Sequence, residues 1–294
     1  RTTYTQMLNP AGGIEADLTV SCLKKNHFRI ICPALARSHN KSHILKNLTK
    51  KVKFEDVTDK YSCIGLFGPN SRKFLTQLLG NYFSNEDFPF SRGKYINISN
   101  IKVWFQRLSF IGELGWEIYI PIKKTSIIFE RIKKMGKKYS LTYSGMHTLD
   151  TLRLEKKFLH WGHDITSENN PFESGLSFAV NLKKKENFIG RKALEKIKDK
   201  PLKKKLELFS LKKNLKPGAP LLLHDEPVFK KDKIVGYTTS SNYSFCYNKN
   251  ICLAYIDDGT QNENDLFVEV EGKKYPLFLE KKPIHDPDSR LMRG

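Results

Sequence analysis

A turn bounded by glycines, between two apolar runs, places the strongest constraint on how this chain folds. Residues 109–121 read S-F-I-G-E-L-G-W-E-I-Y-I-P, and the apolar run 101–110 leads into them. Gly112 and Gly115 permit backbone angles that are closed to other residues, so the chain can turn tightly between the two runs. The pattern therefore predicts a β-hairpin that pairs residues 116–120 with the run before the turn.

Glu117 stands inside the second arm of this hairpin. Side chains alternate along a strand, so Trp116, Ile118 and Ile120 share one face, while Glu117 and Tyr119 lie on the other. The pattern leaves two interpretations open. Glu117 is either a solvated residue on the open face of an antiparallel sheet, which is the commoner case, or a carboxylate that accepts hydrogen bonds from a ligand N–H or amino group. Spacing alone favours the first.

The net charge of +20 comes from 51 Lys and Arg against 31 Asp and Glu, and such a charge is typical of proteins that bind polyanions. The lysines, however, form short clusters spread along the chain instead of one stripe. A general use of Lys at solvated positions explains this distribution more economically, and we expect no nucleic-acid binding. With 294 residues, of which 39% are hydrophobic, the chain is long enough for two or three small domains.

Cysteine usage and hydropathy indicate the compartment. The five cysteines form no C-x-x-C pair, so neither a disulfide framework nor a zinc site is indicated. No apolar run approaches the length of about 20 residues that spans a bilayer, and no secretory leader is visible. We expect no membrane association and a cytoplasmic chain with reduced thiols. Because the chain begins with Arg1 instead of Met, we also expect that a segment is missing before it.

The first two thirds of the sequence mix strand and helix patterns. The expected strands cover 1–8, 14–20, 27–33, 61–67, 94–110 with a bend at 99–100, 116–120 and 176–182. The expected helices cover 38–48, 72–79, 126–135 with Thr125 as N-cap, a segment that starts at 144 or 145, and 188–197. In the fourth of these helices, the apolar side is expected to carry Met146, Leu149, Leu152 and Phe158. Arg153, at the edge of that side, is expected to reach the surface with a buried stem.

The segment 198–205, K-D-K-P-L-K-K-K, is the clearest linker and separates two textures. Before it, residues 1–197 are expected to form one region of about two subdomains. After it, residues 206–294 show short strands without helices between them, which predicts an antiparallel barrel or sandwich. The expected strands cover 205–211, 219–223, 226–229, 233–240, 251–256, 266–270 and 273–278. No internal repeat is visible.

Few residues remain as candidates for chemistry. The sequence contains no dinucleotide-binding or P-loop glycine motif and no G-x-S-x-G elbow. His160 and His163 lie beside an aspartate, but no further ligand is spaced to complete a metal site. Three single charges stand on otherwise apolar elements, namely Asp17, Glu117 and Arg153. Such charges often pair with one another in the interior, so a structural role competes with a functional one.

Several blocks of the sequence resemble the folate-binding part of dimethylglycine and sarcosine dehydrogenases, whose wider family includes the glycine-cleavage T-protein. The blocks include Y-T-Q-M-L-N-P-A-G-G-I-E-A-D-L-T-V (4–20), D-V-T-D-K-Y-S-C-I-G-L-F-G-P-N-S-R (56–72), S-F-I-G-E-L-G-W-E-I-Y-I-P (109–121), L-D-T-L-R-L-E-K-K-F-L-H-W-G-H-D-I (149–165), N-P-F-E-S-G-L (170–176) and P-L-F-L-E-K-K-P-I-H-D-P (276–287). They follow one another in the family's order over nearly the whole chain. The resemblance implies an α+β, cloverleaf-like T-protein fold, with mixed α/β folate-binding domains and a C-terminal antiparallel β-barrel.

The resemblance also implies roles for single residues. The carboxylate of the G-G-I-x-x-D-L motif falls on Asp17 and is expected near the folate N10 and the incoming carbon. The glutamate of G-E-x-G-x-E-I falls on Glu117 and is expected to hold polar edge groups of the pterin. Arg153 in L-R-L-E, Tyr4 and Phe110 are expected to bind folate as well. The family usually has Tyr where this chain has Phe110, so one hydroxyl is absent from the expected site.

The implied activity is one-carbon transfer. In such a reaction, tetrahydrofolate N5 attacks an iminium or aminomethyl carbon from an oxidised methylated amine, and ring closure through N10 gives 5,10-methylenetetrahydrofolate. The leading hypothesis is the C-terminal part of a flavin-linked dehydrogenase with an upstream FAD domain. The alternative is a freestanding aminomethyltransferase of the glycine-cleavage type. From a different class, a non-catalytic basic binding module would show salt-dependent nucleic-acid binding and no folate binding.

Overall fold

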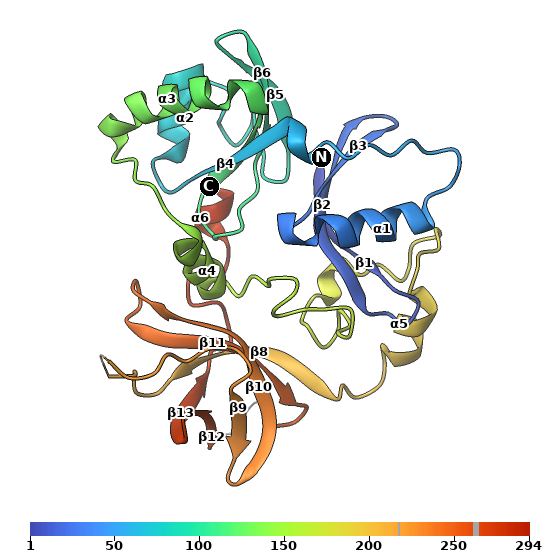
Figure 1. Ribbon diagram of the computed structural model, residues 1–294, viewed down its shortest axis with the longest axis vertical. Helices are drawn as coiled ribbons and strands as arrows, with labels where there is room; N and C mark the ends of the chain where they lie inside the picture. Colours follow the sequence, from blue (N-terminus) through green and yellow to red (C-terminus); the bar gives the residue numbers. More distant parts are fainter. Residues whose placement is uncertain (217, 261–264) are drawn as a thin grey trace. The chain divides into compact units, whose positions relative to one another are not determined.

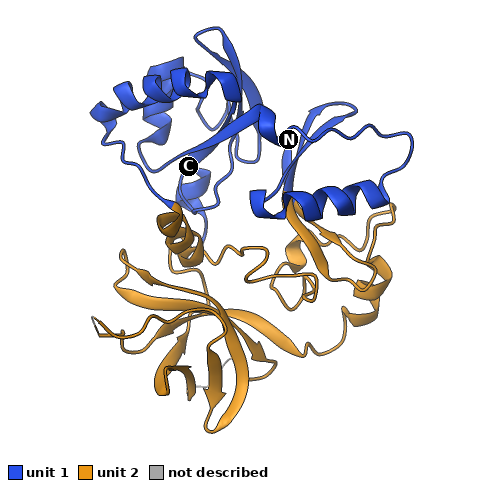
Figure 2. Ribbon diagram, viewed as in Figure 1, with its two compact units in different colours: residues 1–4, 19–145, 288–294 blue, residues 5–18, 146–287 orange. Residues whose placement is uncertain are grey.

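A computed structural model describes residues 1–216, 218–260 and 265–294, and its elements follow one another as Figure 1 shows. By its internal contacts the chain divides into two compact units (Figure 2). Unit 1 contains residues 1–4, 19–145 and 288–294, and unit 2 contains residues 5–18 and 146–287. The expected domain boundaries at 197 and 206 stay a prediction, since these units do not follow sequence order.

A four-stranded antiparallel sheet forms the centre of unit 1, with strand order β4-β7-β6-β5. Its strands are β4 (Tyr61–Phe67), β5 (Gly93–Ile98), β6 (Ile101–Gln106) and β7 (Gly115–Pro121). Helices α2 (Ser71–Leu79) and α3 (Thr125–Gly136) cover one face. Trp116, Ile118 and Ile120 of β7 point into that core and have no exposed surface, as the alternation predicts. Glu117 and Tyr119 therefore lie on the face away from the helices.

A second, three-stranded sheet has the order β1-β2-β3. Its strands are β1 (Thr2–Leu8), β2 (Ile14–Lys24) and β3 (His27–Ile31), and the first two run from one unit into the other. Helix α1 (Arg37–Asn47) follows β3, and the terminal helix α6 (Arg290–Arg293) also belongs to unit 1. The turn between β1 and β2 is the glycine-rich segment 9–13, in which the Asn9 amide N–H donates to the Gly13 carbonyl.

Unit 2 contains α4 (Met146–Glu155), α5 (Arg191–Ile197) and a closed six-stranded antiparallel barrel in the order β10-β11-β8-β13-β12-β9. The barrel strands are β8 (Lys204–Leu211), β9 (Pro227–Lys230), β10 (Lys233–Ser244), β11 (Lys249–Asp257), β12 (Leu266–Val270) and β13 (Lys273–Leu279). Phe209, Val228, Ala254 and Val268 pack together in its interior. Closure leaves no strand edge unpaired, which explains why so many short strands form one stable body.

Two expected strands are wrong. Residues 176–182 form a short 3₁₀ helix at Ser177–Ala179, because the amides of Ala179 and Val180 bond to carbonyls three residues earlier instead of to a neighbouring strand. Within 219–223 the structure assigns no strand. There the carbonyls of Leu222 and Leu223 accept hydrogen bonds from the hydroxyls of Ser241 and Thr238, which replace a strand ladder.

The expected apolar side of α4 is also wrong. Met146 is 72% exposed, while Thr151, Arg153, Leu154 and Glu155 are buried. The helix therefore buries charged groups that pair inside unit 2. Arg153 was expected to reach the surface, but it is buried. Helix α3, finally, begins at Thr125 itself, with Lys124 as N-cap. The Thr125 hydroxyl instead forms a hydrogen bond with the Ser62 hydroxyl of β4 at 2.5 Å.

Candidate functional site

The carboxylate of Glu117 is held by one of its two oxygens. Oε2 accepts a hydrogen bond from the Tyr119 hydroxyl at 2.7 Å and another from Gln106 Nε2 at 3.2 Å. Since a carboxylate oxygen has two lone pairs, these donors saturate Oε2. Within the described part of the chain, Oε1 accepts no hydrogen bond, so it is available to a ligand donor.

Burial governs the ionisation of Glu117. The surrounding groups keep water from the carboxylate and raise its pKa above the ordinary glutamate value, while the hydrogen bonds from Tyr119 and Gln106 act in the opposite direction. Desolvation and the nearby charge of Glu117 raise the pKa of the Cys63 thiol to about 12, and they raise the pKa of the Tyr119 phenol as well. Both neighbours therefore stay uncharged at neutral pH.

The orientation of the Gln106 amide follows from its other contacts. Gln106 has no exposed surface, and its Oε1 accepts from the Ser21 hydroxyl at 2.7 Å and faces the indole Nε1 of Trp104 at 3.4 Å. An indole N–H can only donate, so the amide atom that it faces is the oxygen. The NH₂ group of Gln106 therefore points at Glu117.

A flat apolar surface lies next to Glu117. Gly65 of β4 is the direct cross-strand partner of Glu117. A Cβ atom at Gly65 would come within 2.4 Å of the Phe67 ring, and one at Gly115 within 2.2 Å of the same ring. The ring therefore covers both glycines on the side of the sheet that carries Glu117. An open carboxylate oxygen beside an aromatic ring fits a flat heterocycle that presents N–H groups at its edge.

Asp17 lies in unit 2, half-buried on β2. Its Oδ1 accepts a hydrogen bond from Nε2 of Gln6 on β1 at 3.0 Å. The start of β2 is fixed from outside the hairpin, because the Trp161 indole N–H donates to the Ile14 carbonyl at 2.8 Å. Gly13 approaches the Ser167 carbonyl so closely that a Cβ there would lie 1.8 Å from it. Asp17 therefore stands on a strand that is held in place at its start, and the turn before it has no room for a side chain at position 13.

Arg153 forms hydrogen bonds and ion pairs inside unit 2. Its Nη1 donates to Asp164 Oδ2 at 2.6 Å, its Nη2 to the Ser240 hydroxyl at 2.8 Å and its Nε to Asp150 at 3.2 Å. Asp164 has no exposed surface and also accepts from the Thr239 hydroxyl at 2.6 Å. Arg153 therefore connects α4 to β10 and to the segment after the helix. Its expected contact with folate stays a prediction.

The structure fixes Asp17 with Gln6 in unit 2, and Glu117 with Gln106 and Tyr119 in unit 1. The other expected site residues in unit 1, Tyr4 and Phe110, are both half-buried, and their roles also stay predictions. Sequence reasoning missed Gln6 and Gln106 as partners of the carboxylates. Strand alternation could have found both glutamines, since it places residues of paired strands on a shared face.

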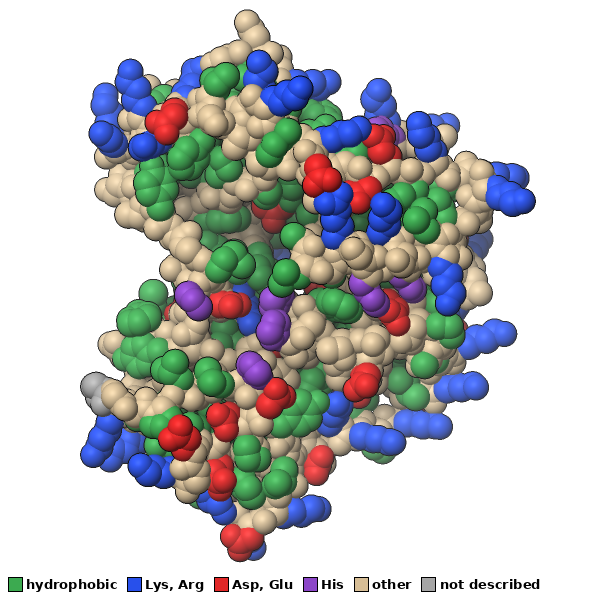
Figure 3. Space-filling view, viewed as in Figure 1, with side chains coloured by type: hydrophobic (Ala, Val, Ile, Leu, Met, Phe, Trp, Pro, Cys, Tyr) green, Lys and Arg blue, Asp and Glu red, His purple; other side chains and the backbone are tan. Residues whose placement is uncertain are grey.

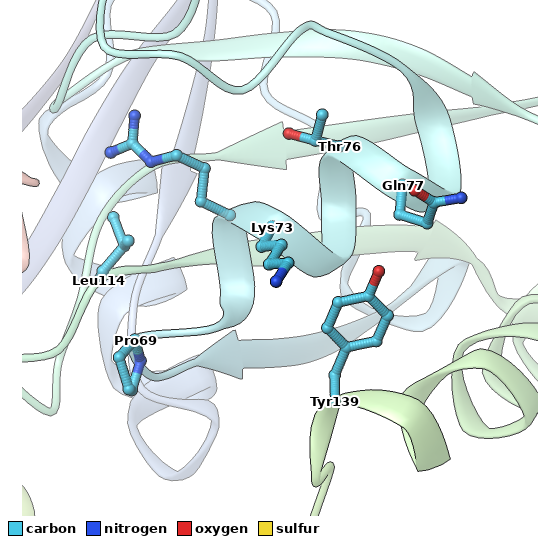
Figure 4. A pocket seen from close by; sticks show the side chains of 7 residues that line it. Pro69, Lys73, Thr76, Gln77, Leu114 and Tyr139 are labelled. Carbon is cyan, nitrogen blue, oxygen red and sulfur yellow. The ribbon is translucent and has the colours of Figure 1, made fainter.

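A cavity of about 390 Å³ lies elsewhere in unit 1, on the helix side of the sheet (Figure 4). The lining side chains belong to Pro69, Arg72, Lys73, Thr76, Gln77, Leu114 and Tyr139. They include none of the expected site residues. Glu117 points to the opposite face of the same sheet, so this cavity is distinct from the candidate site.

Basic side chains and possible metal ligands are two further features of the described residues that bear on function. Lys and Arg side chains lie in several separate groups on the visible face, not in one patch (Figure 3). Among the described residues, no three His, Cys, Asp or Glu side chains are grouped to hold a metal ion, although the His160 and His163 rings stack at 4.8 Å. No helix in the described ranges is both long enough and apolar enough to cross a membrane.

Comparison with protein families identifies the class to which the chain belongs. Residues 1–184 match the GCVT N-terminal domain, and residues 204–286 match the glycine cleavage T-protein C-terminal barrel domain. The chain therefore belongs to the glycine-cleavage T-protein family, which binds tetrahydrofolate and is associated with aminomethyl transfer. The expected fold is confirmed: a crystal structure of glycine cleavage system aminomethyltransferase T from Bartonella henselae superposes with a TM-score of 0.83 over 98% of this chain and 76% of that one, at 20% identity.

Within the family, the chain is homologous to the C-terminal part of dimethylglycine and sarcosine dehydrogenases, as the sequence blocks indicate. It is 33% identical over 292 residues to mitochondrial dimethylglycine dehydrogenase from Mus musculus, which covers 96% of this chain and 33% of that protein. It is 31% identical to the aminomethyltransferase from Listeria monocytogenes serotype 4a, over 96% of this chain and 75% of that protein. The chain thus spans about a third of the length of the dehydrogenases that it matches.

Proposed function

We propose that this chain transfers a one-carbon unit from an oxidised methylated amine to tetrahydrofolate, as the folate-dependent part of a dimethylglycine- or sarcosine-type dehydrogenase. The product would be 5,10-methylenetetrahydrofolate. The observation that carries the proposal is the state of Glu117, in which Oε2 is saturated by two donors while Oε1 accepts none, on the face of the sheet where the Phe67 ring covers Gly65. Family membership supplies the class of ligand that such an arrangement would bind.

Glu117 would bind the pterin edge. An ionised carboxylate accepts hydrogen bonds from ring N–H and amino groups, and such charge-assisted bonds are about twice as strong as neutral ones. Because Oε2 is occupied, we expect the ligand to use both lone pairs of Oε1. Phe67 would lie against the flat ring and limit the access of water to these hydrogen bonds.

Asp17 would act at the reacting atoms. Bound tetrahydrofolate supplies N5 and N10, the two nitrogens that hold the carbon in the product. A carboxylate close to them would take up a proton or stabilise a positive charge that develops during transfer. Gln6 fixes Oδ1 of Asp17 by a hydrogen bond from an uncharged amide.

The alternative is a freestanding aminomethyltransferase of the glycine-cleavage type. Its support is the Listeria aminomethyltransferase, of whose length this chain covers 75%. The amino-acid sequences of the blocks at 15–20, 116–121 and 170–176 favour the dehydrogenase type. The two hypotheses differ in the carbon donor, which is an oxidised methylated amine in the first and an aminomethyl group on a carrier protein in the second. An FAD domain upstream belongs to the first hypothesis only.

Calorimetric titration of tetrahydrofolate into the chain tests the proposed function. We expect binding by the parent and a loss of about 10- to 100-fold in affinity in Glu117→Gln, since the variant removes an ionised acceptor and keeps the shape of the side chain. Glu130→Gln is the matched control, because Glu130 lies exposed on α3 in a surface ion pair with Lys133. No binding by the parent, or equal binding by Glu117→Gln, would overturn the proposal.

A further inference from the structure

Two hairpins of the chain carry the same hydrogen-bonded pair. In the first, Gln6 donates from Nε2 to Asp17 at 3.0 Å, and in the second, Gln106 donates from Nε2 to Glu117 at 3.2 Å. The donor precedes the carboxylate by 11 residues in both cases. A glycine-containing turn separates the two partners each time, and the donor stands on the first strand and the acceptor on the second.

The likeness is hidden in the sequence, where no internal repeat was visible. The segments T-Q-M-L-N-P-A-G-G-I-E-A-D-L (5–18) and F-Q-R-L-S-F-I-G-E-L-G-W-E-I (105–118) share only a few letters at equal positions. The shared positions are the glutamine, a leucine two residues later, a glycine with positive φ in the turn and an acidic residue near the end. The two pairs lie in different units, so the same local arrangement is built twice.

We propose that Gln6 and Gln106 are positioning residues: each fixes one oxygen of its neighbouring carboxylate, and Gln106 thereby directs Oε1 of Glu117 to the ligand. This inference rests on the proposed function for the identity of the ligand. Neither glutamine itself touches the reacting atoms in this assignment.

The choice of an amide donor has a chemical reason. A Lys or Arg in the same place would also hold the carboxylate, but it would neutralise its charge and compete with the ligand for it. A glutamine stabilises the ionised form through a hydrogen bond and adds no charge. The groups that face Glu117 agree with this: Gln106 of β6, the Tyr119 phenol of β7 and the Cys63 thiol of β4 are all uncharged.

The Gln106 amide is itself anchored, which a positioning role requires. Its oxygen accepts from the Ser21 hydroxyl, and Ser21 in turn forms a hydrogen bond with the Thr2 hydroxyl at 2.7 Å. Ser21 has no exposed surface, and Thr2 is 1% exposed. A flipped amide would place NH₂ against the Trp104 indole N–H, two donors facing each other. The buried chain of hydroxyls therefore keeps the NH₂ group directed at Glu117.

The test measures the pKa of the Glu117 carboxyl directly, by its ¹³C chemical shift during a pH titration of the isotope-labelled chain. We expect Gln106→Leu and Gln106→Asn each to raise that pKa by about one unit, because the first lacks the donor and the second falls one methylene short of the acceptor. Gln77→Leu, a change on the exposed side of α2, serves as the matched control and is expected to leave it unmoved. The same titration of Asp17 in Gln6→Leu tests the first hairpin.

Tetrahydrofolate binding, measured across the same pH range, supplies the second readout. We expect the pH at which half of the affinity is lost to rise in the Gln106 variants together with the carboxyl pKa. A purely structural role would lower the melting temperature and leave both midpoints unchanged, and that result would overturn the inference for the hairpin concerned. The ¹³C titration needs no ligand. A parent chain that binds no folate would therefore overturn the proposed function only, and the positioning inference could still be tested.

Discussion

At the scale of single residues, the proposed function depends on one carboxylate with two unlike oxygens. Glu117 uses Oε2 for Tyr119 and Gln106 and keeps Oε1 for a ligand. The arrangement keeps a carboxyl with a raised pKa inside an aromatic environment, which is unfavourable for folding. Such a group is more readily explained by binding than by stability.

The pH dependence of folate binding follows from this raised pKa. A protonated Glu117 would donate where the ligand needs an acceptor, so binding requires the ionised form. Affinity for tetrahydrofolate should therefore be constant near neutral pH and fall as the pH drops through the raised pKa, at a midpoint above the ordinary glutamate value. Calorimetry from pH 8 downwards checks this. A midpoint at or below the ordinary glutamate value would contradict it.

The same group should lower the stability of the unliganded protein. Since the folded state holds the Glu117 proton more tightly than the unfolded state, ionisation destabilises the fold at pH values above the folded pKa, and this effect disappears below the unfolded pKa. Glu117→Gln should therefore raise the free energy of unfolding at pH 7 by about 0.5–2 kcal/mol while it weakens folate binding. Urea denaturation at pH 7 and at pH 4 measures the gain, which should shrink at the lower pH. A loss of stability at pH 7 would contradict the expected sign.

At the scale of secondary-structure elements, the sequence predicted strands better than the buried side of a helix. Strand β4 has the expected bounds, and β5 and β6 bend at Ser99 and Asn100, which both have positive φ. These elements follow from alternation and turn chemistry, which are local. The buried side of α4 does not, because a buried ion pair with Asp164 decides it, and that partner lies 11 residues away on a separate segment. The glutamine–carboxylate pairs were also missed, although strand alternation places both partners of each pair on a shared face.

The ion pair of Arg153 and Asp164 should contribute to the stability of unit 2. Both side chains are buried, with exposed fractions of 4% and 0%. Asp164→Asn should lower the free energy of unfolding by about 3–5 kcal/mol, because it leaves the guanidinium without its charge partner. Glu130→Gln, which breaks a surface pair on α3, should change it by less than about 1 kcal/mol. Equal effects of the two variants in thermal denaturation would contradict a buried structural pair.

At the scale of the whole molecule, each of the two units has a hydrophobic core of its own. The core of unit 1 packs the α2 and α3 helices on a sheet, and that of unit 2 fills a closed barrel. The fold class was predictable because the sequence shows mixed strand and helix patterns in its first two thirds and short strands without helices after them. The division into units was not, because β1 and β2 pass from one unit into the other.

The charge of +20 should produce only weak, salt-dependent attraction to nucleic acid. Its lysines form short clusters spread along the sequence, and on the visible face they lie in separate groups (Figure 3), so we expect a dissociation constant for duplex DNA no tighter than about 10⁻⁶–10⁻⁴ M at physiological salt. Fluorescence anisotropy at 50 and 200 mM salt measures it. Nanomolar binding that persists at 200 mM salt would favour the basic binding module over the enzyme.

The most direct test of the central claim is a crystal structure of the chain with tetrahydrofolate bound. We predict that the pterin lies against Phe67 with its N–H groups within about 3 Å of Glu117 Oε1, while Tyr119 and Gln106 keep their hydrogen bonds to Oε2. A pterin bound elsewhere, such as in the cavity beside Arg72 and Lys73, would contradict the assignment of Glu117. So would a bound pterin that displaces Gln106 from the carboxylate.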